Sequence, residues 1–394
     1  MNTKIKRVSA VIFIICFILL LTLMSLFTLL KDKSQRFSYF ENRMLSDVPQ
    51  ATAETVLSGT YMTDIEAYEK EYIILRDQLL TADALINTKI LNRPVVNDIV
   101  ITDSALLRFF PPNTETERSV LNEAETVANR LKAHSDQVSE YGGHFCYVAV
   151  PCQYVCFEKS YPWYLNNRSE YTNKSSSALF AELEKKGVDY IDMRKSAKNL
   201  SCGFGSTVDN HYGIEGAYQT YAQIIEHINK NSDIATKLFA ESEFEKIQLP
   251  NRYLGSRARK LLGAWKSDEK LSIMYPKESI PFTRTDNGQS VENTVYSIPD
   301  KKEDVSYMVY MGGDNASTLI DTGRPDKPTA LIYGDSFTNA VECISWPSFN
   351  KMYSFDFRHY EEKSLSQLID ELRPDIVICI RDYEALLLTE SNGQ

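Results

Sequence analysis

The residues from Val8 to Leu30 form a run of 23 consecutive uncharged residues, most of them Ile, Leu, Phe or Val. As a helix rising 1.5 Å per residue, this run can cross a hydrocarbon core of about 30 Å. The main alternative is a cleaved signal peptide, which has an apolar region of only ~7–15 residues and a small-residue cleavage site. The run is longer than that, and Thr28-Leu29-Leu30-Lys31 does not resemble such a site. We therefore expect residues 1–30 to be a short cytoplasmic tip and an uncleaved transmembrane signal-anchor.

Basic residues flank the apolar run, three on each side: Lys4, Lys6 and Arg7, then Lys31, Lys33 and Arg36. The first group favours a cytoplasmic N-terminus, which places the remainder of the chain outside the cell. The whole chain carries 43 Lys and Arg against 53 Asp and Glu, a net charge of −10. Nucleic-acid phosphates attract basic surfaces, so we expect no nucleic-acid partner.

Beyond the anchor, the 394-residue chain has the composition of a folded protein, with 43% hydrophobic and 24% charged residues. We expect residues 31–105 to form a polar connector and an N-terminal helical region, because apolar residues recur at helical spacing between Tyr61 and Leu91. Residues 106–394 are predicted to form an α/β domain with a mixed β and loop excursion at about 235–310.

Within this domain, apolar strand-like segments alternate with amphipathic helical segments. The predicted strands are 144–150, 187–192, 329–333, 352–357 and 375–380, and the predicted helices are 115–131, 177–186, 214–229 and 362–372. Buried strands that alternate with helices indicate a mostly parallel sheet covered by helices on both faces, which is a three-layer α/β architecture.

The sharpest local motif is Gly334-Asp335-Ser336, which directly follows the apolar strand-like segment 329–333. This position puts Ser336 just past the carboxyl end of a central strand, the edge at which open α/β sheets bind ligands. The N–H groups of a following helix could stabilise an oxyanion there. Without catalysis, Asp335 or Ser336 would serve as a helix cap.

A second motif, Asp209-Asn210-His211, lies immediately before the helical segment that begins at Ile214. A serine nucleophile needs a general base with a pKa near neutrality, and histidine is the usual one. That base needs a partner that fixes its tautomer, which Asp209 could supply. In the alternative interpretation, Asp209 caps a turn and His211 is a packed polar residue.

These motifs together resemble the signature of the DHHW family. In that signature, an Asp-His-His-Trp stretch precedes Gly-Ala-Tyr on a helix, as Asp209-Asn210-His211-Tyr212 precedes Gly216-Ala217-Tyr218 here. The family is related to the alginate O-acetyltransferase-like branch of SGNH hydrolase-like proteins. Four other stretches are similar and occur in family order: Phe-Glu-Asn-Arg-Met-Leu at 40–45, Tyr-Met-Gly-Gly-Asp at 310–314, Asp-Ser-Phe-Thr-Asn at 335–339 and Asp-Phe-Arg-His-Tyr at 356–360. The resemblance covers roughly residues 38–385.

The resemblance implies an SGNH hydrolase-like domain with a catalytic triad of Ser336, His211 and Asp209. The Asp-x-His pair precedes the serine, which is a permuted order relative to simple SGNH esterases, but triads are defined by geometry and not by chain order. Asn210 and Tyr212 replace the middle His and the Trp of the signature. Gln153 stands where we expect a lysine in many relatives, which puts a charged substrate contact in doubt.

Three further residues are candidates for supporting roles. Asn339 could donate a side-chain hydrogen bond to an oxyanion, together with the Ser336 backbone N–H, although it could equally be a solvated helix residue. Arg358 and Tyr360 follow a predicted strand on the same edge and could bind a sugar. Pairing of Arg358 with Asp356 or another carboxylate is at least as plausible from the sequence. The stretch around Glu41 is expected to tie the connector to the folded domain.

These expectations describe a membrane-anchored, extracellular serine O-acyltransferase that moves an acetyl group onto a cell-envelope or exported polysaccharide through an acetyl-serine. Because acetyl donors are cytoplasmic, a multispanning membrane acyltransferase is the implied donor. A carbohydrate O-acetyl esterase with the same triad, or a non-catalytic polysaccharide-binding or assembly protein, are the alternatives. A serine ester needs no metal or organic cofactor, so none is expected.

The seven cysteines contain no CxxC pair and no Cys/His group with zinc-ligand spacing. Cys146 and Cys379 lie in apolar strand-like segments and are most simply buried hydrophobic residues. A disulfide among Cys152, Cys156 and Cys202 is possible in an oxidising exterior.

Overall fold

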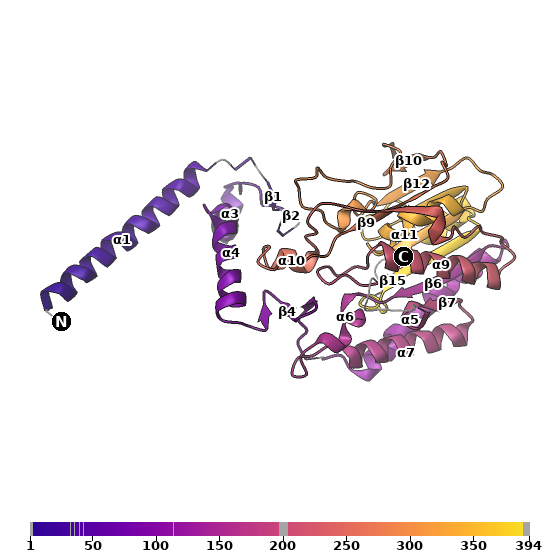
Figure 1. The fold of residues 1–394 in the computed structure, drawn as a ribbon, viewed down its shortest axis with the longest axis horizontal. Helices are drawn as coiled ribbons and strands as arrows, with labels where there is room; N and C mark the ends of the chain where they lie inside the picture. Colours follow the sequence, from indigo (N-terminus) through magenta and orange to yellow (C-terminus); the bar gives the residue numbers. More distant parts are fainter. Residues whose placement is uncertain are drawn as a thin grey trace. The chain divides into compact units, whose positions relative to one another are not determined.

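The computed structural model describes residues 3–31, 33–34, 36–38, 40–41, 43–112, 114–196 and 204–388 (Figure 1). The chain divides into two compact units. The first unit contains residues 1–97 and 259–265, and the second contains residues 98–258 and 266–394.

The first unit begins with the long helix α1 (Thr3–Leu30). The segment Arg7–Thr28 of this helix is the one span among the described residues that is long and apolar enough to cross a membrane, with a mean hydropathy of 3.0. A signal sequence would have the same properties. The unit continues with short elements: β1 (Phe37–Ser38), β2 (Arg43–Met44), α2 (Ala53–Ser58), α3 (Thr60–Tyr72), α4 (Arg76–Leu85), the π-helical turn η1 (Ile86–Ile90) and β3 (Val95–Val96).

Ion pairs attach the connector after α1 to the helices of the same unit. Glu41 lies 2.5 Å from Arg76 of α4, and Arg43 lies 2.6 Å from Glu71 of α3. Asn42, the residue between them, lies outside the described residues. The charged residues of the Glu-Asn-Arg stretch therefore make contacts within the first unit.

The second unit is built on an eight-stranded sheet with the order β11-β10-β12-β14-β13-β15-β6-β7. The strands are β6 (His144–Val150), β7 (Tyr190–Asp192), β10 (Thr283–Asp286), β11 (Gln289–Ser290), β12 (Ser317–Asp321), β13 (Ala330–Gly334), β14 (Lys351–Phe355) and β15 (Ile376–Asp382). The five strands from β14 to β7 are parallel, and β12, β10 and β11 extend the sheet in antiparallel fashion. The predicted mostly parallel sheet is confirmed, with four of the predicted strands as its centre.

Helices cover this sheet in two groups (Figure 1). Helix α5 (Glu117–Ser139) packs with α7 (Ser169–Lys186) and with α12 (Leu365–Leu372), whereas α9 (Ile214–Asn231) packs with α11 (Thr338–Ser345). Both α5 and α9 contact β6. The helices form because apolar residues recur along one face; α9, for example, buries Ala217, Tyr221, Ile224 and Ile228. The result is the predicted three-layer α/β architecture.

The remaining elements are short. They are β4 (Ile99–Ile101), β5 (Leu106–Arg108), α6 (Gln153–Cys156), η2 (Glu158–Ser160), α8 (Met193–Ser196), η3 (Glu241–Glu243), β8 (Phe244–Gln248), α10 (Ser256–Lys260), β9 (Ser272–Pro276), η4 (Tyr307–Val309) and η5 (Trp346–Ser348). The excursion at 235–310 is indeed a mixture of short strands and loops. Part of it joins the main sheet, however, because β10 pairs with β12 in register from Thr283 to Asp286.

Two helix starts differ from the sequence-based expectation by three residues or more. Helix α7 begins eight residues before Ser177, at Ser169. Its first turns bury Thr172, Ser175 and Ser176, and their hydroxyls donate to helix carbonyls, so this buried face is polar and lacks apolar periodicity. Helix α12 begins at Leu365 and not at Glu362, because Ser364 caps it through a reciprocal pair of hydrogen bonds with Gln367.

Candidate active site

Ser336 lies at the carboxyl edge of the parallel sheet, in the turn between β13 and α11. A Cβ at Gly334 would lie 2.0 Å from the carbonyl oxygen of Ile380 on the neighbouring strand, so the end of β13 has no room for a side chain. Asp335 then shapes the turn, because its Oδ1 accepts the N–H of Phe337 at 3.0 Å. The chain therefore makes a tight turn at Ser336, whose own side chain is half-buried.

Asp209 and His211 lie in a tight loop that ends at the start of α9. The loop is closed by a bridge between Gly205 and Tyr212, and the Ser206 hydroxyl accepts the N–H of Asp209 at 3.0 Å. The Tyr212 hydroxyl donates to the carbonyl of Phe337, next to Ser336. This hydrogen bond links the histidine loop directly to the serine turn.

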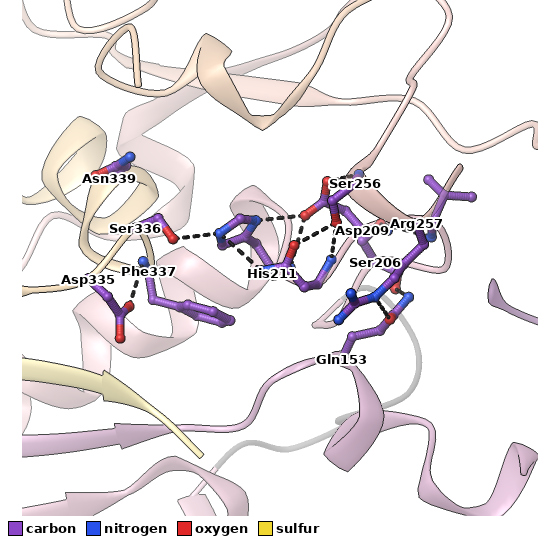
Figure 2. Close-up of polar contacts among 12 residues, drawn as sticks. Gln153, Ser206, Asp209, His211, Ser256, Arg257, Asp335, Ser336, Phe337 and Asn339 are labelled. Carbon is purple, nitrogen blue, oxygen red and sulfur yellow. Dashed lines mark hydrogen bonds and ion pairs between the residues drawn. The ribbon is translucent and has the colours of Figure 1, made fainter. Parts of the chain in front are cut away.

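The side chains of Ser336, His211 and Asp209 form a continuous hydrogen-bonded chain (Figure 2). Ser336 Oγ lies 2.7 Å from His211 Nε2, and His211 Nδ1 lies 2.6 Å from Asp209 Oδ1. Asp209 Oδ1 also accepts the backbone N–H of His211 at 3.0 Å. In this geometry the imidazole can take the hydroxyl proton at Nε2 while Asp209 holds Nδ1.

Asp209 is the buried end of this chain, with 1% of its surface exposed. Burial by itself raises the pKa of Asp209, but the adjacent His211 and the backbone N–H groups of His211 and Ser256 outweigh it and lower the pKa below its usual range. The Ser256 N–H reaches Asp209 Oδ2 at 2.6 Å. The carboxylate is therefore ionised and hydrogen-bonded on both oxygens.

The imidazole of His211 is held between aromatic rings. The Tyr307 ring stacks on it with a centroid distance of 3.8 Å and an interplanar angle of 8°, and Phe337 lies at 5.0 Å. Asn210 adds an amide nitrogen 3.3 Å from Nε2. Sequence reasoning did not identify Tyr307 or Ser256, since both come from the excursion at 235–310, which has no recognisable motif at these positions.

Asn339, the candidate oxyanion donor, lies in the first turn of α11 and is 6% exposed. Its Nδ2 donates to Asp314 Oδ1 at 2.8 Å, which occupies one of its two amide protons. Figure 2 shows its side chain on the same side of the turn as Ser336. Among the described residues, no acceptor is paired with the backbone N–H of Ser336. One N–H from each of these two residues is thus available to a ligand.

Arg358 is held by two carboxylates and is partly exposed. Its Nε lies 2.9 Å from Asp356 Oδ1, and its second terminal nitrogen lies 2.9 Å from Asp314 Oδ2. Burial tends to lower the pKa of Arg358, but Asp356 and Asp314 raise it above its usual range. Arg358 therefore pairs with Asp356, as one of the two sequence interpretations expected, and it connects through Asp314 to Asn339.

Tyr360 lies beside Arg358 at the end of β14 but does not join this hydrogen-bonded group. Its ring packs against Phe355 with a centroid distance of 4.9 Å and against Phe357 at 6.1 Å. Its contacts in this structure are those of a packing residue, with part of the ring open to solvent.

Gln153, at the position where we expected a lysine in relatives, is buried behind the histidine loop. Its Nε2 donates to the carbonyls of Leu106 and Ser206 at 2.8 and 2.9 Å, and its Oε1 accepts from Arg257 at 3.2 Å. Gln153 therefore supports the loop that carries Asp209 and does not present a charge to a substrate.

A second acidic group lies near the triad, at the end of β15. Burial and the negative charge of Asp335 raise the pKa of Asp382 to about 7, against the opposing influence of Arg381 and His211. Arg381 is fully buried, and one of its terminal nitrogens lies 3.5 Å from Asp335 Oδ2. Asp382 is therefore an acidic group with a raised pKa close to His211.

Two groups of side chains among the described residues have atoms close enough to share a metal ion: Cys146, Asp189 and His227, and Asp314, Asp356 and His359. Neither group includes a triad residue. Cys152 and Cys156 are buried free thiols, so they do not form a disulfide with each other. Cys202, the third cysteine of that expectation, lies outside the described residues.

No protein-family model matches the sequence, and a search of curated proteins found no match. Solved structures do match. Bacillus cereus PatB1, in a structure with a sulfonyl adduct, aligns with a TM-score of 0.62 and 22% identity over 73% of this chain and 97% of that chain. A DHHW family protein from Eubacterium siraeum aligns with a TM-score of 0.57 and 15% identity over 74% of this chain and 93% of that chain.

The O-acetyltransferase domain of Pseudomonas putida AlgJ aligns with a TM-score of 0.44 and 12% identity over 74% of this chain and 93% of that chain. At the identities of PatB1 and the Eubacterium siraeum protein, the likeness is one of fold. The resemblance to the DHHW family, first suggested by short motifs, is therefore confirmed at the level of the fold, which this chain shares with a DHHW family protein and with PatB1.

Proposed function

We propose that this protein is a serine O-acyltransferase that moves an acetyl group onto a cell-envelope or exported polysaccharide. The observation that carries the proposal is the hydrogen-bonded chain of Ser336, His211 and Asp209, with distances of 2.7 and 2.6 Å. Nucleophile and base lie within hydrogen-bonding reach, and a third group orients the base, which is the arrangement that covalent serine catalysis requires.

In the first half-reaction, Ser336 Oγ attacks the carbonyl carbon of the acetyl donor while His211 Nε2 takes the hydroxyl proton. The donor's carbonyl oxygen becomes an oxyanion, to which the Ser336 N–H and the second amide proton of Asn339 can donate. Collapse of this intermediate breaks the bond to the leaving group, which receives the proton from His211. The product is an acetyl-serine.

In the second half-reaction, a sugar hydroxyl attacks the acetyl-serine and passes its proton to His211. The intermediate collapses to an O-acetyl sugar, and Ser336 Oγ recovers its proton. The ionised, buried Asp209 stabilises the imidazolium that forms in both steps. Arg358 and Tyr360, at the same edge of the sheet, are the proposed sugar contacts.

The proposed location is the outer face of the cell membrane, with α1 as an uncleaved anchor. The hydropathy and length of Arg7–Thr28 support this placement, and so do the basic residues that precede it. Since acetyl donors are cytoplasmic, we propose that a multispanning membrane acyltransferase delivers the acetyl group.

The sulfonyl adduct carried by PatB1 supports the proposed role of Ser336 as a nucleophile, because sulfonyl groups attach to activated nucleophiles.

The test is covalent labelling of the full chain in detergent, with p-nitrophenyl acetate and a sulfonyl fluoride as separate reagents. Mass spectrometry should find one acetyl or sulfonyl group on Ser336. Ser336→Ala should lose the label, and His211→Ala should lose nearly as much of the labelling rate, because triad members act as a unit. Ser139→Ala, a change in an exposed serine at the end of α5, is the matched control and should label like the wild type.

The fate of the acetyl group separates a transferase from an esterase with the same triad. Polysaccharide fragments should accelerate loss of acetyl from the labelled protein and should themselves gain it. Release that is insensitive to any sugar would indicate an esterase. Wild-type protein that never gains a label with any donor would favour a non-catalytic polysaccharide-binding role.

A further inference from the structure

A second cluster of titratable side chains lies at the amino edge of the parallel sheet, opposite the triad. His144 is the first residue of β6, and Cys146 lies two residues later on the same face of the strand. Tyr147 pairs with Tyr190, so the residue before each, Cys146 and Asp189, are also neighbours across the two strands. The last turns of α9 add His227.

The atoms of this cluster are close together. His227 Nε2 lies 2.7 Å from Asp189 Oδ1, and His144 Nε2 lies 2.9 Å from Asp189 Oδ2. The sulfur of Cys146 and one ligand atom each from Asp189 and His227 all lie within 4.8 Å of one another. In tetrahedral zinc sites the ligands lie ~2.0–2.3 Å from the metal, and therefore ~3.3–3.8 Å from each other. Contraction by about 1 Å would bring the ligand atoms of Cys146, Asp189 and His227 to that spacing.

The chemistry of the cluster matches the preferences of zinc. Thiolate, imidazole and carboxylate are the three ligand types that zinc takes, and soft sulfur disfavours calcium or magnesium. Asp189 already contacts both histidines through its two carboxylate oxygens. Zinc binding would release the proton of the Cys146 thiol.

The cluster is also reachable from solvent. Cys146 is fully buried, but the side chains of Asp189 and His227 are 30% and 25% exposed. Asn231 lies on the outer side, with its amide nitrogen 2.8 Å from His227 Nε2. An ion could therefore approach past His227 and reach the sulfur at the bottom.

We propose that Cys146, Asp189 and His227 bind a zinc ion, with His144 as the fourth ligand. A thiolate, a carboxylate and two neutral imidazoles would balance the charge of the ion. The ligands come from β6, the loop before β7, and α9. Because they lie far apart along the chain, no metal-binding motif of fixed spacing could identify the site in the sequence. The proposal does not depend on the catalytic proposal, because the cluster and Ser336 lie at opposite ends of the parallel strands.

The experiment uses the full chain in detergent, stripped with a chelator under reducing conditions and reloaded with Zn²⁺ or Co²⁺. We expect one Zn²⁺ per chain after dialysis, measured by plasma mass spectrometry. Co²⁺ should give the visible bands of a tetrahedral site and a near-ultraviolet thiolate-to-cobalt charge-transfer band. Reloading with zinc should also raise the melting temperature, because the ion binds the folded state.

Two variants and two controls locate the site. Cys146→Ala should lose the charge-transfer band, and His227→Gln, on the helix surface, should weaken zinc binding at least ~10-fold without a risk to the core. Cys379→Ala removes an equally buried thiol from the neighbouring strand, but on the opposite face, since Cys379 pairs with Tyr147. His359→Gln removes the histidine of the other candidate group. Both controls should bind zinc and cobalt like the wild type.

The proposal is overturned if the stripped wild-type chain retains no zinc after reloading, or if cobalt binds without a thiolate band. It is also overturned if His227→Gln binds zinc as tightly as the wild type. Loss of the metal in His359→Gln, with retention in His227→Gln, would assign the ion to the other group.

Discussion

The two ends of the parallel sheet each carry an Asp–His pair, and the pairs differ in which imidazole nitrogen faces the carboxylate. At the carboxyl edge, Asp209 contacts His211 Nδ1 and leaves Nε2 directed at Ser336 Oγ. At the amino edge, Asp189 contacts Nε2 of both His144 and His227. The first pair leaves the outer nitrogen free to exchange a proton with a hydroxyl, whereas the second uses that nitrogen to hold the carboxylate.

This comparison shows that an Asp–His contact does not by itself indicate a function. The function depends on which other group contacts the pair. A hydroxyl at 2.7 Å makes His211 a candidate base. A buried thiol and a second imidazole make Asp189 and His227 candidate metal ligands. Substitutions that alter one pair and leave the other intact test this distinction.

The largest expected difference comes from the two matched carboxylate changes. Asp209→Asn should fold and yet slow acylation of Ser336 by about 10⁴-fold, if serine protease precedent transfers, because the imidazole loses its orienting partner. Asp189→Asn should leave the acylation rate within a few-fold of the wild type. Burst kinetics with p-nitrophenyl acetate measure both, and equal losses would contradict the separation of the two pairs.

Gly255→Ala should disturb the backbone that supports Asp209 in the triad. A Cβ there would lie 2.4 Å from the carbonyl oxygen of Val208 and 2.8 Å from Asp209 Cβ, so the backbone that carries the Ser256 N–H must shift. We expect a loss of about 1–3 kcal/mol in the free energy of unfolding, together with slower acylation. Gly213→Ala is the control, since its Cβ would meet only the flexible end of Glu215 at 3.3 Å. Denaturant titration of both variants checks the difference.

The triad residues could be named from the sequence because each lies in a motif beside a regular element. Ser336 follows an apolar strand, and Asp209 and His211 precede an amphipathic helix; the structure brings their side chains together, while their catalytic role stays a prediction. Ser256 and Tyr307 could not be named, because they reach the site from irregular segments through contacts that leave no periodicity in the sequence. The same is true of Cys146, whose partners come from a separate loop and a helix.

Acid should weaken the amino-edge pair only at low pH. The pKa of Asp189 is about 2 in the folded chain and ~3.9 when unfolded, so its contribution is complete above pH ~4 and is lost as the pH falls toward 2. The shift corresponds to about 2 kcal/mol. In metal-free protein, Asp189→Asn should therefore be less stable than the wild type at pH 6 and nearly equal to it at pH 2. A constant difference across that range would show that the ion pairs contribute nothing.

The smallest expected effect concerns the ring that stacks on His211. Tyr307→Phe keeps the stacked ring and should acylate like the wild type. Tyr307→Leu removes the aromatic contact, worth about 0.5–1.5 kcal/mol, and should slow acylation by at most about tenfold. A larger loss in Tyr307→Phe than in Tyr307→Leu would show that the hydroxyl, and not the ring, supports the base.

The position of β15 in the sheet has a consequence for when the candidate site can assemble during synthesis. This strand lies between β13, which leads to Ser336, and β6, yet it comes late in the chain, at Ile376–Asp382. A nascent chain that has not yet released these residues cannot join the two halves of the sheet, and pairing over such sequence separations is slow. Ser336 and His211 can therefore meet only after nearly all of the described chain has been synthesised. This order of assembly keeps the proposed nucleophile apart from its proposed base until the last strand of the sheet is in place.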